Sequence, residues 1–190
     1  MIVPDNTLSI QRYWHDILDV VIPWKIVFAT PYTVTRDPKL RNFQHKLIMK
    51  YLPSNRLLFT WGLIESPLCS FCKDVVEDYF HLFWDCRHIS QFWNSVNLWF
   101  NGVAGTTHAF NATGCILGDI TDQSSRQLNL FLLLGRYYIF KCKLLDKIPA
   151  IAGFKLYVKF IIEVESRINN LEEAKRKFIA KWGLFSTYFD

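Results

Sequence analysis

The stretch LCSFCKDVVEDYFHLFWDC, from Leu68 to Cys86, holds three of the five cysteines of the chain together with one histidine. It reads C-x2-C-x8-H-x4-C. Three thiolates and one imidazole are a standard ligand set for tetrahedral zinc, and a C-x2-C pair lets one tight turn direct two sulfurs at one ion. The spacing predicts a single structural zinc ion, and the predicted ligands are Cys69, Cys72, His81 and Cys86. The simpler interpretation is that these residues are buried thiols and a hydrogen-bonded histidine that share no metal ion.

The predicted ligand set also indicates what the metal would do. A catalytic zinc ion keeps one coordination position open for water, and four good ligands leave none. We expect Glu77 and Asp78 to be solvated or to cap a helix, and His88 is an alternative ligand. No strand-helix context supports a redox role for the C-x2-C pair. We therefore expect no catalytic residues and no enzymatic activity in this chain.

Composition indicates a folded domain in a reducing compartment. The 190 residues are 51% hydrophobic and 16% aromatic, which is enough for a sizeable core. The N-terminus lacks the basic and apolar regions of a signal peptide, and the longest apolar run, 128–140, is too short to span a bilayer. We expect an intracellular protein, in the cytoplasm or nucleus, with reduced thiols. Cys115 and Cys142 are expected to be buried.

Apolar spacing along the chain is helical, and no segment alternates as a strand would. The sequence predicts an all-α fold with a small zinc-stapled insert. The predicted divisions are an N-terminal extension with a short helix (1–36), a helical zinc-binding region (37–101), a loop (102–121) and a C-terminal pair of long helices (122–190).

Individual boundaries follow from capping residues and prolines. We expect residues 33–35 to be extended, and a helix to begin after Asp37 and end before Pro53. A second short helix is expected between Ser54 or Asn55 and Gly62. Asp122 is a candidate N-cap for the next-to-last helix. The last helix is predicted to run from about 151 to 181, with fraying near Asn169.

Basic residues are concentrated in the helix that precedes the cysteines. The net charge is +5, and the window 36–56 carries six Lys or Arg residues against Asp37 alone. On a continuous helix, Lys39, Lys46 and Lys50 lie within about 20° of one line, beside the apolar face Leu40–Phe43–Leu47–Tyr51. Such a stripe suits phosphate contact, although an ordinary solvated face is the alternative.

The full set of candidate nucleic-acid contacts is Lys39, Arg41, Lys46, Lys50, Arg56 and Phe71, the last as an exposed ring. The cysteine segment itself is acidic: Glu65, Asp74, Glu77, Asp78 and Asp85 lie between 65 and 86, against Lys73 alone. We expect this segment to repel phosphate.

Several motifs together carry a family resemblance. They are LRNFQHKLIMKYLPSNRLLFTWGLIESPLCSFC (40–72), HLFWDC (81–86) and LLGRYYIFKCKLLDKIPAIAGFK (133–155). With these motifs the chain, from about Trp24 to Trp182, resembles the zinc-binding region that follows the reverse transcriptase domain in non-LTR (LINE-type) retrotransposon polyproteins. The resemblance implies the same four zinc ligands and nucleic-acid binding that helps template or target engage the polymerase. The Y-x-D-D motif of the polymerase is absent here.

Two functions remain open from the sequence. The first is a zinc-binding domain that binds RNA or DNA, or both, with low sequence specificity. The second is a structural or protein-interaction module that packs against the reverse transcriptase body, in cis or in trans, without touching nucleic acid. Neither function involves a membrane or a small-molecule substrate.

Overall fold

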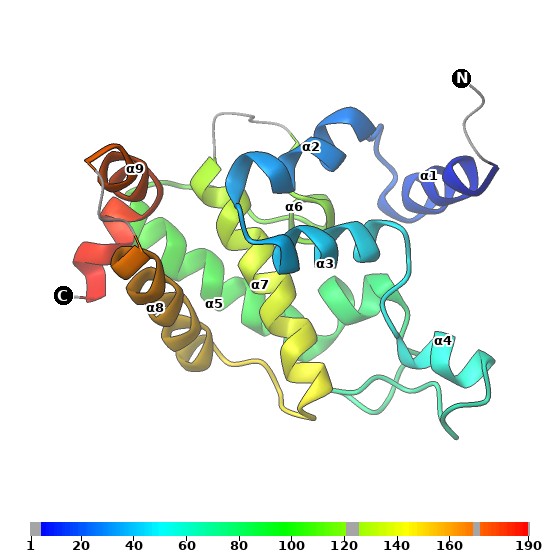
Figure 1. Cartoon of the computed structure of the whole chain (residues 1–190). Coiled ribbons are helices and arrows are strands. Elements are labelled where there is room, and N and C mark those ends of the chain that lie inside the picture. Colours follow the sequence, from blue (N-terminus) through cyan, green and yellow to red (C-terminus); the bar gives the residue numbers. More distant parts are fainter. Residues whose placement is uncertain (1–4, 121–125, 169–171, 190) are drawn as a thin grey trace.

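The computed structural model describes residues 5–120, 126–168 and 172–189. All regular elements in these ranges are helices (Figure 1). The elements are α1 (Asp5–Leu18), α2 (Trp24–Val34), α3 (Pro38–Ile48), α4 (Asn55–Thr60), the π-helical η1 (His81–Asp85), α5 (Arg87–Ala104), α6 (Ala112–Leu117), α7 (Arg126–Leu144), α8 (Ile151–Ile168) and α9 (Glu172–Phe189). The only extended pairing in the described ranges is an isolated bridge between Leu68 and Val76. The predicted all-α class is confirmed.

Helix α7 lies at the centre of the fold, with α2, α3, α5, α6, α8 and α9 packed around it (Figure 1). Most of its side chains are buried, because a helix that is apolar on nearly every face must be covered on every face. Arg136 is a charged residue among these buried side chains and is only 1% exposed. Its guanidinium donates to Gln44 Oε1 (2.8 Å) and to the carbonyl oxygen of Gly114 (2.9 Å), and burial lowers its pKa to about 9.

Aromatic rings fill the part of the core beside the C-terminal helices. Phe131 of α7 packs on Phe185 of α9 with ring centroids 4.0 Å apart. Edge contacts join Phe131 to Trp99, Phe154 and Trp182. These rings come from four different helices, so burying them ties α5, α7, α8 and α9 together.

Helix α2 replaces the loop and extended segment that we predicted before Asp37. It runs through Pro31 to Val34, although proline and β-branched residues disfavour helix interiors. Val27, Pro31 and Val34 are buried, and α2 packs on α7. Tertiary burial therefore outweighs local preference here. In the predicted loop 102–121, the end of α5 and the short α6 are helical.

Helix α3 is shorter than predicted. Asp37 caps its start as expected, accepting from the Lys39 N–H at 2.8 Å. Its end is a Schellman motif: the Tyr51 N–H donates to Lys46 O (2.7 Å) and the Lys50 N–H to Leu47 O (3.0 Å). Lys50 takes the left-handed conformation with φ of 61°. The helix therefore stops before Lys50, and Tyr51, predicted on the buried face, is 56% exposed.

The last predicted helix is instead a helical hairpin of α8 and α9. Lys181 Nζ lies 2.7 Å from Glu165 Oε1, and Trp182 Nε1 donates to Glu165 Oε2 at 2.7 Å. In a continuous helix, residues 165 and 181 would be about 24 Å apart, at about 1.5 Å per residue. The prediction of one helix over 151–181 is therefore wrong. The predicted cap at Asp122 and the fraying near Asn169 lie outside the described residues.

Two further sequence expectations concern thiols and membranes. Cys115 and Cys142 are buried free thiols, as predicted. None of the helices in the described ranges combines the length and apolar character that crossing a bilayer requires.

Candidate functional site

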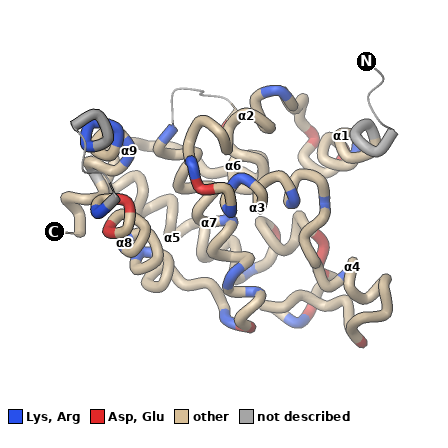
Figure 2. Tube along the Cα trace, in the orientation of Figure 1, with Lys and Arg blue, Asp and Glu red and all other residues tan. Residues whose placement is uncertain are grey.

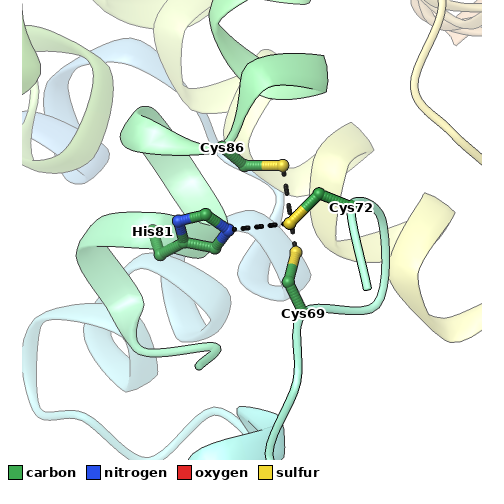
Figure 3. A group of neighbouring side chains, drawn as sticks. All are labelled: Cys69, Cys72, His81 and Cys86. Atoms are coloured by element: carbon green, nitrogen blue, oxygen red, sulfur yellow. Dashed lines mark hydrogen bonds between the residues drawn. The ribbon is translucent and has the colours of Figure 1, made fainter. Parts of the chain in front are cut away.

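The first two cysteines lie on a tight turn between α4 and η1. The turn is closed by the Cys69 N–H donating to Val75 O (2.8 Å) and by the Lys73 N–H donating to Cys69 O (3.0 Å). Lys73 has a left-handed φ of 57°, which folds the chain back after Cys72. Both sulfurs consequently point to the same side of the turn (Figure 3).

The other two candidate ligands are positioned by a π turn. The Cys86 N–H donates to His81 O at 3.1 Å, five residues back along the chain. In an α-helix, residues five apart point about 140° away from each other. The wider π turn brings both side chains to one side, and Cys86 then leaves the helix with ψ of 131°. The Asp78 carboxylate accepts from the His81 N–H at 2.8 Å and holds the start of this turn.

The four candidate ligands form one buried cluster, with ligand atoms all within 4.8 Å of one another (Figure 3). Two sulfurs that bind the same zinc ion at about 2.3 Å in tetrahedral geometry are about 3.8 Å apart. Cys69 Sγ and Cys86 Sγ are 3.8 Å apart, and Cys72 Sγ lies 3.3 Å from His81 Nε2. The donor set and its spacing fit one tetrahedral zinc ion.

The surroundings of two of the three sulfurs favour the thiolate, which is the form that zinc binds. Burial alone would raise the pKa of Cys72, but N–H groups of Val75 and Asp74 and the ring of His81 outweigh it and lower that pKa. The pKa of Cys86 is lowered mainly by its hydrogen bond from Cys69. The pKa of Cys69 is raised, first by that same contact and then by burial.

The second ring nitrogen of His81 indicates which nitrogen is the ligand. Nδ1 is buried, has no hydrogen-bond partner, and lies 3.6 Å from Asp85 Oδ2. A zinc-bound histidine typically directs its other N–H at a carboxylate, which fixes the ring. With Nε2 facing the sulfurs, Asp85 is in place for that positioning role. From the sequence, Asp85 is predicted only to add negative charge to this segment.

Glu77 links the cysteine turn to the central helix. It is fully buried, and its Oε1 lies 2.6 Å from Lys143 Nζ near the end of α7. The same carboxylate accepts from the N–H groups of Asn55 and Ser70, each at 2.8 Å. Of the two alternatives expected for Glu77, solvation is wrong, and the carboxylate instead caps a helix, because Asn55 is the first residue of α4. Pairing with Lys143 also removes one charge from the acidic surface that we expected around the cysteines.

No curated protein and no solved structure matches this chain. The buried Cys3His cluster defines a zinc-binding domain with a closed ligand set. Residues 10–93 match the family described as zinc-binding in reverse transcriptase. This segment is therefore a zinc-binding domain of the reverse transcriptase type, and the match includes all four candidate ligands.

The predicted nucleic-acid contacts do not form one continuous stripe. Lys39 and Lys46 are exposed on α3, as expected. Lys50 lies beyond the helix end, with Nζ 3.5 Å from the centroid of the Tyr13 ring. Arg41 donates to Thr35 O at 2.7 Å, and its guanidinium lies over the ring of Tyr32 in α2. These contacts stabilise the connection between α2 and α3. Arg56 is exposed in the first turn of α4.

Phe71 is not the exposed ring that we predicted. Its side chain is 5% exposed and belongs to the buried core, and its N–H donates to Cys69 Sγ at 3.3 Å. A turn that closes around buried sulfurs needs an apolar cover, and Phe71 provides part of it. It is therefore unsuited to stacking on a base.

Sequence reasoning missed the residues that join the site to the rest of the fold. The single hydroxyl hydrogen of Tyr79 is shared between Lys50 O (2.5 Å) and Leu52 O (2.8 Å). Tyr79, two residues before η1, therefore holds the chain that leaves α3. Lys143 lies far away in sequence and has no local signal. Only the position of Tyr79 beside the H-x4-C motif could have drawn attention to it.

Proposed function

We propose that this domain binds RNA or DNA with low sequence specificity through the exposed face of α3. The observation that carries the proposal is the placement of Lys39 and Lys46. They are seven residues apart, about 20° from alignment on the helix, and both are exposed. Leu40, Phe43 and Leu47 bury the neighbouring side of α3, about a right angle away, so the two ammonium groups are presented on a fixed support.

The surrounding charge supports this assignment. Positions of Lys and Arg recur along α3 and at its junctions with neighbouring helices (Figure 2). Lysine contacts to phosphate are insensitive to base sequence and release counterions, which supplies most non-specific affinity. Exposed Arg56 on α4 extends the set of cations beyond the helix end.

The zinc centre is proposed to be structural rather than catalytic. Four protein ligands complete a tetrahedral site, so when bound the ion supplies rigidity and offers no position to a substrate. Glu77 and Tyr79 transmit this rigidity, the first to α7 and the second to the end of α3. The chain is then a non-enzymatic part of an RNA-directed DNA polymerase system, with nucleic acid and the polymerase body as partners.

A binding titration tests the role of α3. Changing Lys39 and Lys46 together to Glu should weaken binding of single-stranded RNA and of duplex DNA at physiological salt. The slope of log affinity against log salt should become shallower by roughly one to two units. Lys147→Glu with Lys159→Glu is the control, because it makes the same change in net charge on α8 and the loop before it. Equal affinity for both double variants would contradict the assignment to α3.

A second function is supported by exposed apolar side chains near the zinc centre. Helix α4 has no buried residue, and Phe59, Trp61 and Leu63 are 47%, 60% and 66% exposed. Clustered aromatic and aliphatic exposure of this kind is typical of protein contact surfaces. We propose packing against a reverse transcriptase body as the alternative to direct nucleic-acid contact.

Co-purification separates the two functions. The chain would be expressed together with a reverse transcriptase domain from a non-LTR retrotransposon polyprotein, the kind that this chain resembles. The native chain would be compared with the double variant Trp61→Ser, Leu63→Ser. Association that is lost in this variant, together with no affinity for RNA or DNA by the isolated chain, would favour the interaction module.

A further inference from the structure

The Schellman motif at the end of α3 has lysine where glycine is favoured. A residue with a Cβ pays a steric penalty in the left-handed region, and glycine is the usual choice at this position. Lys50 has φ of 61° there. The motif requires the left-handed conformation, but it does not require a lysine there. Strain from a side chain that glycine would avoid often marks a residue retained for function. The question is therefore what the Lys50 side chain contacts.

Lys50 lines an open recess between α1 and the end of α3, about 470 Å³ in volume. The recess is lined by Ser9, Ile10, Arg12, Tyr13, Asp16, Met49 and Lys50. Its size is within the usual range of small-molecule sites, about 300–1,000 Å³. Two cationic side chains, Arg12 from α1 and Lys50 from the α3 end, thus reach one concave surface from different elements.

The recess carries two basic side chains, Arg12 and Lys50, against one carboxylate, Asp16. Partial burial and then the positive charge of Arg56 lower the pKa of Lys50, and Asp78 acts in the opposite direction. Asp78 already accepts the N–H of His81, and the Asp16 carboxylate lies 3.6 Å from Nδ1 of its neighbour His15. Lys50 Nζ lies over the Tyr13 ring, which orients it without neutralising it.

The end of α3 also carries an exposed ring. Tyr51 follows Lys50 directly, and its side chain is 56% exposed because the Schellman motif turns it away from the core. Tyr51 and Lys50 are both held by a turn whose carbonyls accept from Tyr79 Oη. Cation and ring in this combination suit a phosphate and an unstacked base, which single strands offer and duplexes do not.

We propose that the recess between α1 and the end of α3 is a single-strand site, in which Arg12 and Lys50 bind a phosphate and Tyr51 stacks on the adjacent base. The site deepens the proposed nucleic-acid binding and rests on it. It adds Arg12 and Tyr51 to the interface and gives the domain a preference for single strands. Lys39 and Lys46 on α3 contact backbone phosphates of either form.

Lys50→Gly tests the proposal, because it relieves the backbone while removing the cation. The probe is a fluorescent single-stranded RNA of mixed sequence, compared with duplex DNA of equal length. We expect single-strand affinity to fall roughly tenfold, as for loss of a charge-assisted hydrogen bond. Duplex affinity should change less than about threefold. Tyr51→Ala should weaken single-strand binding by about tenfold without changing duplex binding.

Lys73→Gly is the matched control. Lys73 also has a left-handed φ, 57°, and its side chain is directed to Asp146 rather than to the recess. The same substitution there should leave both affinities unchanged. Thermal unfolding of Lys50→Gly should occur at the same temperature as in the native chain or higher.

The outcomes separate this site from the broader proposal. Unchanged single-strand affinity in Lys50→Gly and Tyr51→Ala would overturn the recess site, while binding through α3 would stand. A clear loss of stability in Lys50→Gly would show that the fold itself needs the lysine and would also overturn it. If the native chain binds neither probe, the proposed function itself fails.

Discussion

The cysteine turn with η1, residues 68–86, and the aromatic cluster around Phe131 are stabilised in different ways. In the first, four ligand atoms lie within 4.8 Å of one another, and a buried carboxylate is satisfied by three partners. In the second, Phe131 packs against Trp99, Phe154 and Phe185. The first arrangement depends on exact donor geometry around an ion, and the second on apolar area removed from water.

This difference should divide the molecule into two parts with separate sensitivities. Metal removal should loosen the 68–86 segment and leave the aromatic cluster folded, whereas cavity mutations should do the reverse. Lys143 of α7 links directly to the 68–86 segment through its ion pair with Glu77 and a hydrogen bond to Ser70 Oγ (2.9 Å).

The largest effect is expected from removing one zinc ligand. Cys86→Ala should abolish stoichiometric zinc binding, because apparent binding free energies of structural zinc are about 10–16 kcal/mol and depend on the complete ligand set. The purified protein should contain one zinc ion per chain, and the variant much less. Elemental analysis measures this directly. Cys115→Ala, which removes another fully buried thiol, should keep its zinc.

A cavity in the aromatic cluster should destabilise the fold without affecting the metal. Phe131 is fully buried, so Phe131→Ala should lower the free energy of unfolding by about 3–5 kcal/mol. Urea denaturation gives the free energy, and the zinc content of the folded fraction should stay at one. Loss of zinc at low urea would show that the two parts are not separate.

Breaking the Glu77–Lys143 ion pair should lower the free energy of unfolding by a smaller amount, which depends on which of the two residues remains. Lys143→Met leaves the fully buried Glu77 carboxylate without its cation and should cost about 3 kcal/mol. Adding Glu77→Gln should restore part of this loss, because the uncompensated charge is gone, while the amide keeps only one of the two oxygens that accept the Asn55 and Ser70 N–H groups. If the single and double variants are equally unstable, the ion pair is not the link.

The smallest expected effect compares two helical glycines. A Cβ at Gly135 would lie 2.6 Å from Cη2 of Trp93, so Gly135→Ala should cost about 1–3 kcal/mol. A Cβ at Gly102 meets nothing within 4 Å, and Gly102→Ala should stabilise α5 by up to about 1 kcal/mol. Thermal unfolding should shift in opposite directions for the two variants.

The sequence predicted the parts of this molecule whose signals are local. The ligand spacing, the Asp37 cap and the buried thiols depend on residues close together in the chain, and the structure places them as expected. Features set by distant partners were not accessible. Glu77 is buried because Lys143 reaches it from α7, and α2 is helical because it packs on the same helix.

The α3 surface shows an intermediate case. Its first half follows the predicted pattern, but its end does not. Glycine usually occupies the left-handed position of a Schellman motif and so marks the helix end in the sequence, whereas lysine occupies it here. Without that signal, the helix was extended to Pro53, and Lys50 and Tyr51 were assigned to the wrong faces.

Hydrogen exchange before and after chelation tests the central claim most directly. The Cys69, Ser70 and Glu77 amides donate hydrogen bonds within the zinc-stapled turn. With zinc bound they should be protected, and after chelation they should exchange at least tenfold faster, while the buried amides of α7 keep their protection. Unchanged protection in the 68–86 segment after the metal is removed would contradict the structural role that we assign to zinc.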